Sequence, residues 1–190
     1  MTQEEVLQVF KDNDALLEGH FVLSSGLHSP NYMQCALVLQ NPAATEKLCR
    51  EIANKFKEEK PTAVIAPALG GVLVSYEVAR ALGVKGIFTE RKDGEMLLRR
   101  GFTLSDKDRV IIVEDIITTG RSTKEVIDVV KGKGSQIIGV ACIGDRTEGK
   151  VEFGVPFKSL AKVSIPVFSQ EECPLCKKGI PLVKPGSGTK

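Results

Sequence analysis

The sequence lacks residues and runs that several classes of protein require. It contains no tryptophan and only two tyrosines, so an aromatic surface that stacks the bases of a single-stranded nucleic acid is not expected. No apolar run approaches the roughly 18 residues of a membrane-spanning helix. The acidic N-terminus has no apolar segment typical of a secretion signal. We therefore expect a cytoplasmic protein with neither nucleic acid nor a membrane among its partners.

The five cysteines do not form the even, regular set of a disulfide framework. Cys35, Cys49 and Cys142 lie within apolar patterns and are expected to be small core residues. Cys173 and Cys176 form one C-x-x-C motif, with no second pair and no histidine close by in the sequence. A zinc site there would need ligands from elsewhere in the chain or from another subunit, so a structural or incidental pair is favoured.

Strand and helix patterns alternate through the middle of the chain. The apolar runs predict strands at 62–66, 86–90, 110–115 and 136–143, and helices at 72–82 and 121–132. Such an alternation is typical of a parallel sheet, in which ligands bind beyond the carboxyl ends of the strands. Before this region, residues 2–18 are expected to form one amphipathic helix and residues 20–39 to contain two strands. Asn41 followed by Pro42 begins a further helix.

The segment 110–123 carries the strongest functional signal. Its first four residues are apolar and β-branched, as in a strand buried on both faces, and Glu114 and Asp115 close that strand. A loop rich in hydroxyl groups and glycine then leads into a helix. Backbone N–H groups at such a helix start bind phosphate, and carboxylates accept hydrogen bonds from sugar hydroxyls. The segment is predicted to hold a ribose 5-phosphate; the alternative is an ordinary turn in which Asp115 and Ser122 are helix caps. The signatures of P-loop and dinucleotide-binding proteins are absent.

The strand, the two acids and the loop follow one another in the same order as in the phosphoribosyl-diphosphate (PRPP) binding signature of the type I phosphoribosyltransferases, which the segment resembles. The resemblance implies an α/β fold with a central parallel sheet flanked by helices and a small hood built from both ends of the chain. The chain would be one domain, with the PRPP-binding core at 60–150 and the hood at 1–40 and about 155–190. Glu114 and Asp115 would bind the ribose hydroxyls and serve catalysis. The residues implied to hold the 5-phosphate are Thr118, Thr119, Gly120, Arg121 and Ser122, and Ile116 and Ile117 are also implied to bind PRPP.

Other stretches narrow the resemblance to the orotate phosphoribosyltransferases. They are residues 19–32, 68–71, 90–102 and 145–146, together with the C-x-x-C motif. An arginine offers two parallel hydrogen bonds to a carboxylate such as that of orotate. Arg146 is therefore the expected orotate-binding cation, with Thr118 and Ser25 completing the polar contacts. Without the resemblance, an ion pair of Arg146 with Asp145 or Glu148 would be the simpler interpretation.

Residues 90–101 are expected to form a β-hairpin with Asp93 and Gly94 at its turn. Charged tips of this kind are usually only solvated, but the four cations of this segment suit a diphosphate leaving group. The resemblance implies a flexible lid that closes over the active site of the neighbouring subunit, and hence a homodimer. Arg91 and Lys92 are the lid residues expected to contact PRPP, and Lys92 is also a catalytic candidate.

The resemblance implies that the protein transfers the phosphoribosyl group of PRPP to orotate, giving orotidine 5′-monophosphate and diphosphate. Mg²⁺ would be held by PRPP, and no protein side chain is assigned to it. The alternatives are a sister enzyme acting on a purine or uracil, and a regulator that binds PRPP without turnover. Compared with better-known members, the lid is shorter and lacks histidine, and Gly70 replaces a lysine. The residue that assists proton transfer is therefore open. His28 either contacts the substrate or bonds within its loop, and His20 has no predicted role.

Overall fold

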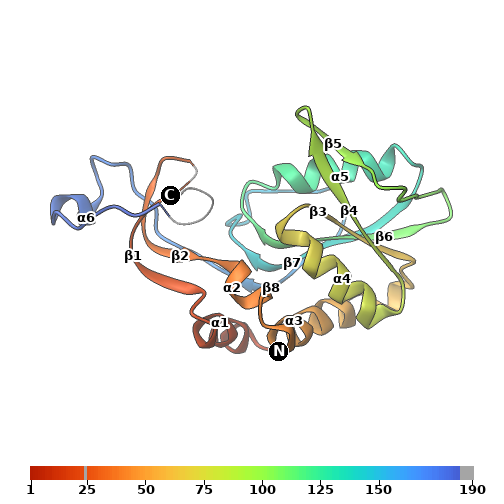
Figure 1. The fold of residues 1–190 in the computed structure, drawn as a ribbon, viewed down its shortest axis with the longest axis horizontal. Helices are drawn as coiled ribbons and strands as arrows, with labels where there is room; N and C mark the ends of the chain where they lie inside the picture. Colours follow the sequence, from red (N-terminus) through yellow and green to blue (C-terminus); the bar gives the residue numbers. More distant parts are fainter. Residues whose placement is uncertain (24, 185–190) are drawn as a thin grey trace.

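A computed structural model describes residues 1–23 and 25–184 of the chain. Figure 1 shows a larger part, in which helices cover a twisted sheet, and a smaller hairpin unit beside it. Ser24, from the polar loop of that hairpin, and residues 185–190 lie outside the described residues. Within the described residues, no helix has the length and apolar character needed to cross a membrane.

The larger part is built on a six-stranded sheet with the strand order β5-β4-β3-β6-β7-β8. All neighbouring strands run parallel except β4 and β5, which form an antiparallel hairpin. The strands are β3 (Ala63–Pro67), β4 (Lys85–Lys92), β5 (Glu95–Leu98), β6 (Arg109–Ile117), β7 (Gln136–Asp145) and β8 (Phe157–Lys162). The predicted parallel α/β architecture is therefore confirmed.

Strand β6 lies in the interior of the sheet, and the four apolar residues 110–113 that open its apolar run are fully buried. Because successive side chains of a strand point to opposite faces, these residues supply two separate cores. Ile111 and Val113 pack in the core on one face, and Val110 and Ile112 pack in the core on the other. The continuous apolar run of the sequence thus reflects a strand that helices cover on both sides.

Helices α3 (Pro42–Asn54) and α4 (Gly70–Leu82), with α1 (Gln3–Asp12) and α2 (Cys35–Leu39), cover one face of the sheet, and α5 (Arg121–Lys131) covers the other (Figure 1). Two predicted helix ends are confirmed. The Asn41 side chain accepts a hydrogen bond of 3.3 Å from the backbone N–H of Ala44, which caps α3. Gly83, with φ of 69°, ends α4 in the left-handed conformation that glycine favours. Two short helices complete the list: η1 (Lys57–Glu59) and α6 (Pro174–Lys177).

The single helix predicted over residues 2–18 is wrong. Helix α1 ends at Asp12, and Asp14 adopts a left-handed conformation with φ of 52°, which aspartate tolerates better than most residues. The chain then enters β1 (Leu16–Val22), which pairs antiparallel with β2 (His28–Met33). The two predicted strands of 20–39 correspond to these, but Cys35–Leu39 forms the short helix α2.

The β1–β2 hairpin and the C-terminal segment together form the hood. Phe21 bridges to Val183, and His28 bridges to Phe168. Strand β8 belongs to the main sheet, although its residues fall within the segment expected to contribute to the hood. Hydrogen bonding within a parallel sheet draws β8 beside β7, so only the residues after Lys162 reach the hairpin.

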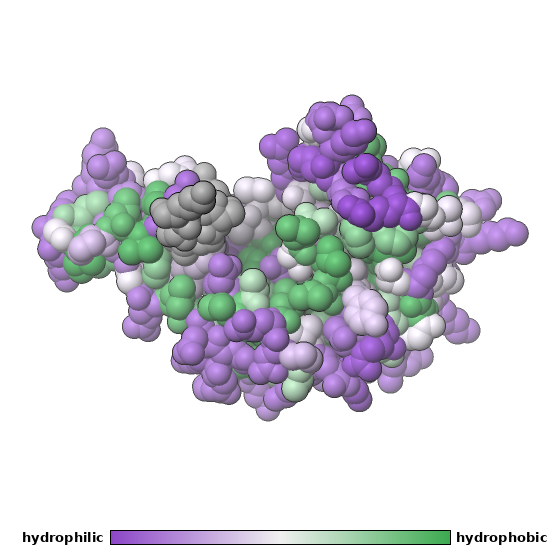
Figure 2. All heavy atoms as spheres, in the orientation of Figure 1, coloured by the Kyte–Doolittle hydropathy of each residue, from purple (hydrophilic) through white to green (hydrophobic). Residues whose placement is uncertain are grey.

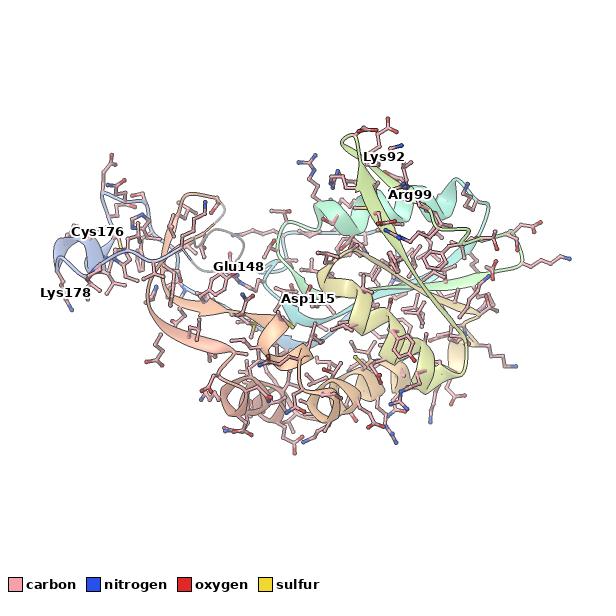
Figure 3. All side chains as sticks on the ribbon, in the orientation of Figure 1. Lys92, Arg99, Asp115, Glu148, Cys176 and Lys178 are labelled. Carbon is pink, nitrogen blue, oxygen red and sulfur yellow. The ribbon has the colours of Figure 1, made fainter. Side chains whose placement is uncertain are left out.

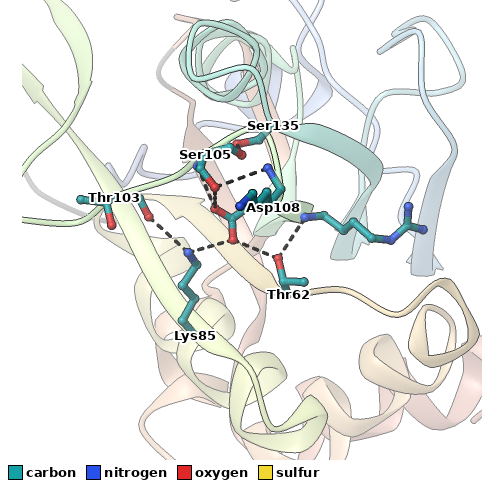
Figure 4. Close-up of polar contacts among 8 residues, drawn as sticks. Thr62, Lys85, Thr103, Ser105, Asp108 and Ser135 are labelled. Atoms are coloured by element: carbon teal, nitrogen blue, oxygen red, sulfur yellow. Dashed lines mark hydrogen bonds and ion pairs between the residues drawn. The ribbon is translucent and has the colours of Figure 1, made fainter.

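A polar cluster fixes the edge of the sheet that lies opposite the carboxyl ends of the strands (Figure 4). Asp108, just before β6, accepts hydrogen bonds from Lys85 Nζ at 2.8 Å, Thr62 Oγ1 at 3.0 Å and the Ser105 backbone N–H at 2.8 Å. Burial opposes ionisation of Asp108, but these partners outweigh it and lower its pKa to about 2. Asp108 therefore ties the starts of β3, β4 and β6 together as a carboxylate.

Candidate active site

A cavity of about 980 Å³ lies between the carboxyl edge of the sheet and the hood. Several elements far apart in the sequence line it. The hood hairpin supplies Val22, Ser25, Leu27 and Tyr32. Strand β6 supplies Asp115, and the loop after it supplies Thr118 and Thr119. The loop after β7 supplies Arg146, Thr147 and Lys150. This is the edge at which a parallel sheet binds its ligands. Figure 3 shows Asp115 and Glu148 on the side of the sheet that faces the hood.

A smaller hollow of about 120 Å³ is formed by Glu114 and residues 116–123. Gly120 is the N-cap of α5, with φ of 70°, and has no side chain with which to cap the helix. A Cβ atom on Gly120 would lie 2.7 Å from Val151 Cγ1, so only glycine fits this position. The backbone N–H of Arg121 donates a long hydrogen bond of 3.4 Å to Thr119 Oγ1. The first turn of α5 and the positive end of its dipole suit an anion.

Glu114 and Asp115 are half-buried at the end of β6. Burial, together with the charge of Asp115, raises the pKa of Glu114 to about 9. Burial also raises the pKa of Asp115, against the opposing effect of backbone N–H groups. A Cβ atom on Gly70 would lie 2.8 Å from the Asp115 carboxylate oxygens, so the start of α4 approaches the acids closely because it lacks a side chain.

Arg146 follows β7, and its backbone N–H donates to the Ile117 carbonyl at 2.8 Å, which fixes it beside the signature loop. The expected alternative, an ion pair with Asp145 or Glu148, is wrong. Asp145 accepts the backbone N–H of Thr147 at 2.8 Å, and Glu148 pairs with Lys150. Burial lowers the pKa of the Arg146 guanidinium, which the structure places on the cavity without a carboxylate partner among the described residues.

The structure brings the predicted substrate-binding residues together at this edge. Ser25, Thr118 and Arg146 line the same cavity as Asp115, and Thr118 lines the smaller hollow as well. The remaining loop residues line the smaller hollow: Ile116, Ile117, Thr119, Gly120, Arg121 and Ser122. Ser24 is outside the described residues.

The lid residues do not reach the cavity of their own chain. The predicted hairpin is confirmed, with Asp93 and Gly94 at its turn and Arg91 paired with Met96. Arg91 donates to the Gly94 carbonyl at 2.7 Å and forms an ion pair with Glu125 of α5. Figure 3 shows Lys92 near the tip of the hairpin, pointing away from Asp115.

Sequence reasoning missed three features of the cavity and the hood. Tyr32 and Lys150 line the cavity; Tyr32 ends the polar stretch 19–32 that carried the resemblance, but nothing in the sequence marked Lys150. His20 and His28 are both buried in the hood beside Cys173 and Cys176, and neither lines the cavity. The one sequence feature that could have indicated this cluster is the spacing of the two histidines on either side of a hairpin turn.

Comparison with known proteins identifies the family. The profile of the phosphoribosyl transferase domain matches residues 37–174. An orotate phosphoribosyltransferase from Caldanaerobacter subterraneus is 52% identical over 187 residues, which cover 98% of both chains. The chain belongs to the orotate phosphoribosyltransferase family. Another member, from Caldicellulosiruptor saccharolyticus, is 54% identical over the same share of each chain. The family is one of enzymes that transfer a pentosyl group, as the resemblance predicted.

Solved structures agree with the fold of this family. An orotate phosphoribosyltransferase from Aeropyrum pernix superposes with a TM-score of 0.71 at 26% identity, covering 83% of this chain and 93% of the other. An adenine phosphoribosyltransferase from Trypanosoma brucei reaches a TM-score of 0.63 at 17% identity, with 81% of this chain covered and 79% of the other. The second likeness shows the type I phosphoribosyltransferase fold alone.

Proposed function

We propose that this chain transfers the 5-phosphoribosyl group from PRPP to orotate, giving orotidine 5′-monophosphate and diphosphate in the synthesis of UMP. The observation that carries the proposal is two adjoining hollows that share Thr118 and Thr119 and that suit two different groups. Glu114 and the start of α5 line the smaller hollow, whereas Asp115 and Arg146 line the larger cavity, and Arg146 has no carboxylate partner among the described residues. The first suits a ribose phosphate, and the second suits a planar base that bears a carboxylate.

The PRPP half of the site uses backbone more than side chains. The N–H groups that begin α5 bind the 5-phosphate in the smaller hollow, where Thr119 and Ser122 add hydroxyl groups. Glu114 and Asp115 accept hydrogen bonds from the ribose hydroxyls. Both glycines near the site are needed for space. A side chain at Gly120 would collide with Val151, and a side chain at Gly70 would collide with the Asp115 carboxylate.

The orotate half uses Arg146, Thr118 and Ser25. The guanidinium of Arg146 forms paired hydrogen bonds with the carboxylate, and the hydroxyl groups bind the polar edge of the ring. Uracil and the purine bases lack this carboxylate. Arg146 would remain a half-buried charge without a partner in the complexes with those bases, which penalises their binding.

Catalysis proceeds by displacement at C1 of the ribose. The bond between C1 and diphosphate breaks, the diphosphate oxygen takes the electron pair, and positive charge develops on the sugar ring. Glu114 and Asp115, as carboxylates beside the ribose, stabilise that charge. The orotate ring nitrogen then supplies the electron pair of the new bond to C1 and loses its proton, which leaves to solvent with the products. The hood and lid exclude water from the activated sugar.

Mg²⁺ fits this donor set. Two adjacent carboxylates with raised pKa values form no ion pair among the described residues, and a hard cation bound with PRPP would favour their charged forms. When bound, the ion neutralises part of the charge of the diphosphate. The ion is held mainly by PRPP, and Glu114 and Asp115 would be the nearest protein carboxylates.

The proposal includes a homodimer that works in the cytoplasm, in which Arg91 and Lys92 of one subunit contact PRPP in the other. The support is an apolar face on α4, formed by Leu69, Leu73 and Tyr76, which are 87%, 50% and 63% exposed. Figure 2 shows hydrophobic side chains gathered over this helix. Residues at this spacing share one helix face, and exposed apolar patches are typical of protein interfaces. The patch adjoins the site, because α4 begins beside Asp115.

A spectroscopic assay tests the function. The absorbance of orotate should fall only when PRPP and Mg²⁺ are both present. A panel with uracil, adenine and hypoxanthine should show no comparable turnover. A preference for one of these bases would favour a sister enzyme, and PRPP binding without turnover of any base would favour a regulator.

Asp115→Asn provides the matched catalytic variant. The amide keeps the shape of the side chain but loses the charge, so the turnover number should fall about 100-fold or more while the thermal midpoint stays near that of the wild type. A variant that turns over at the wild-type rate would remove Asp115 from the chemistry.

A further inference from the structure

Four side chains that commonly bind metals converge in the hood. His20 lies in β1 and His28 begins β2, whereas Cys173 and Cys176 belong to the turn that contains α6. One donor atom from each residue lies within 4.8 Å of the other three. Three of the four residues are buried, and Cys176 is partly buried. Figure 3 shows Cys176 at the outer end of the hood, away from Asp115.

The separations of the donor atoms match a tetrahedron around one ion. His20 Nε2 lies 3.0 Å from His28 Nδ1, 3.5 Å from Cys173 Sγ and 3.7 Å from Cys176 Sγ, and His28 Nδ1 lies 3.2 Å from Cys176 Sγ. Zinc bonds of ordinary length in a tetrahedron require about 3.3 Å between two nitrogens and about 3.6 Å between nitrogen and sulfur. Each of these four separations is within about 0.4 Å of this geometry.

The orientation of the His20 ring also suits a metal ligand. His20 Nδ1 lies 2.7 Å from the Ile180 carbonyl, to which only an N–H can donate, so His20 Nε2 carries the free lone pair. That one lone pair faces a nitrogen and two sulfurs at once. A backbone carbonyl that fixes the tautomer and the ring orientation is the usual outer partner of a histidine that binds a metal.

We propose that His20 Nε2, His28 Nδ1 and the sulfur atoms of Cys173 and Cys176 bind one Zn²⁺. Two sulfurs and two nitrogens in a tetrahedron are typical of zinc. Binding releases the two thiol protons to solvent, and the two thiolates balance the charge of the ion, so the buried site is neutral. The site is structural, because four protein ligands leave no open position for a substrate.

The ion joins the C-terminal segment to the hairpin that forms one wall of the cavity. A two-stranded hairpin is marginally stable by itself, and α6 has only four residues. The same hairpin contributes Val22, Ser25 and Leu27 to the lining of the cavity. Zinc therefore holds in place the hairpin that forms this wall.

Metal analysis of the purified full-length chain tests the proposal. The wild type should contain close to one equivalent of zinc, and Cys176→Ser should lose at least nine-tenths of it. The matched control is Cys49→Ala, which removes a buried cysteine of α3 outside the cluster and should retain the zinc. Replacement of zinc by Co²⁺ should give the intense visible bands of a tetrahedral cobalt thiolate, and these bands should be absent from Cys176→Ser.

Refolding gives an independent measurement that needs no variant. Wild-type protein refolded without zinc should unfold at a midpoint about 5–10 °C below that of protein refolded with one equivalent. Equal midpoints, together with zinc-free purified protein, would overturn the proposal. A mass lower by two hydrogen atoms, which marks a disulfide between Cys173 and Cys176, would overturn it as well.

Discussion

At the scale of single residues, the acid pair at the end of β6 combines two conflicting requirements. In the proposed function Glu114 and Asp115 are charged beside the ribose, yet burial favours the protonated form of each in the free protein, and the charge of Asp115 adds to this for Glu114. In the proposed complex, sugar hydroxyls and a nearby cation would favour the carboxylates. The free protein would then tolerate a locally unfavourable arrangement that the substrate stabilises.

This arrangement predicts how stability depends on pH. The pKa of Glu114 is about 9 in the folded protein and near 4.5 when unfolded, so unfolding releases a proton between these values. The free energy of unfolding should therefore fall as the pH rises from 5 to 9, by at most about 1.4 kcal/mol per pH unit from this group. Thermal midpoints across this range should decline less steeply in Glu114→Gln. Glu152→Gln, at an exposed glutamate, should keep the wild-type slope, and parallel slopes in all three proteins would contradict the raised pKa.

The position of Arg146 on the cavity leads to a second prediction for a single residue, which concerns the KM for orotate. Arg146→Ala should raise the KM for orotate roughly 30–200-fold, because a charged pair of hydrogen bonds contributes about 2–3 kcal/mol. The KM for PRPP should change little, since PRPP occupies the other part of the cavity. Steady-state kinetics with each substrate varied in turn measure both values. Equal increases in the two KM values would mean that Arg146 stabilises the whole site and does not bind the carboxylate of orotate specifically.

At the scale of helices and strands, the sequence predicted those elements whose pattern is unambiguous. The runs 110–115 and 136–143 could only be buried strands, and Gly83 after an apolar helix could only be its end. The predicted end of the first helix was wrong because Leu17 continues the helical spacing of Val6 and Phe10. What makes Leu16–Val22 a strand is its pairing with β2, a partner that local spacing does not reveal.

The cluster around Asp108 allows the stability of the sheet to be changed without changing the residues of the candidate active site. Asp108→Asn should lower the free energy of unfolding by about 1–3 kcal/mol, because the charged contact with Lys85 is lost. Since the pKa of Asp108 is lowered, its contribution is present above about pH 4 and is lost as the pH falls towards 2, so the variant should lose less stability over that range. Denaturant titrations at pH 7 and pH 3 measure both effects.

The same variant should keep the wild-type KM for both substrates, because Asp108 lies at the opposite edge of the sheet from the cavity. Asp106→Asn is the matched control, since Asp106 is exposed and two residues away. A loss of activity in Asp108→Asn at a temperature where it remains folded would show that the two edges are coupled.

At the scale of the whole molecule, the active site depends on contacts between distant parts of the chain. The hood joins residues near 20 to residues near 180, as in the contact of His20 with the Ile180 carbonyl. Local patterns could place the PRPP half of the site, because that half is one continuous segment. They could not predict that Tyr32 and Lys150 line the same cavity or that His20 lies beside Cys173, because these arrangements depend on how distant parts of the chain meet.

The proposed lid extends this dependence to a second chain, and mixed dimers test it. Lys92→Ala and Asp115→Asn should each be nearly inactive alone. If Lys92 acts on the partner's site, a dimer with one subunit of each variant regains one complete site, because intact Asp115 of one subunit meets intact Lys92 of the other. Unfolding and refolding an equal mixture should restore about a quarter of the wild-type activity, since half of the dimers are mixed and each has one working site. A lid that serves its own chain would leave the mixture as inactive as its components. The Leu73→Glu variant, which places a charge on the apolar face of α4, should sediment as a monomer and abolish the recovery when it is built into both partners.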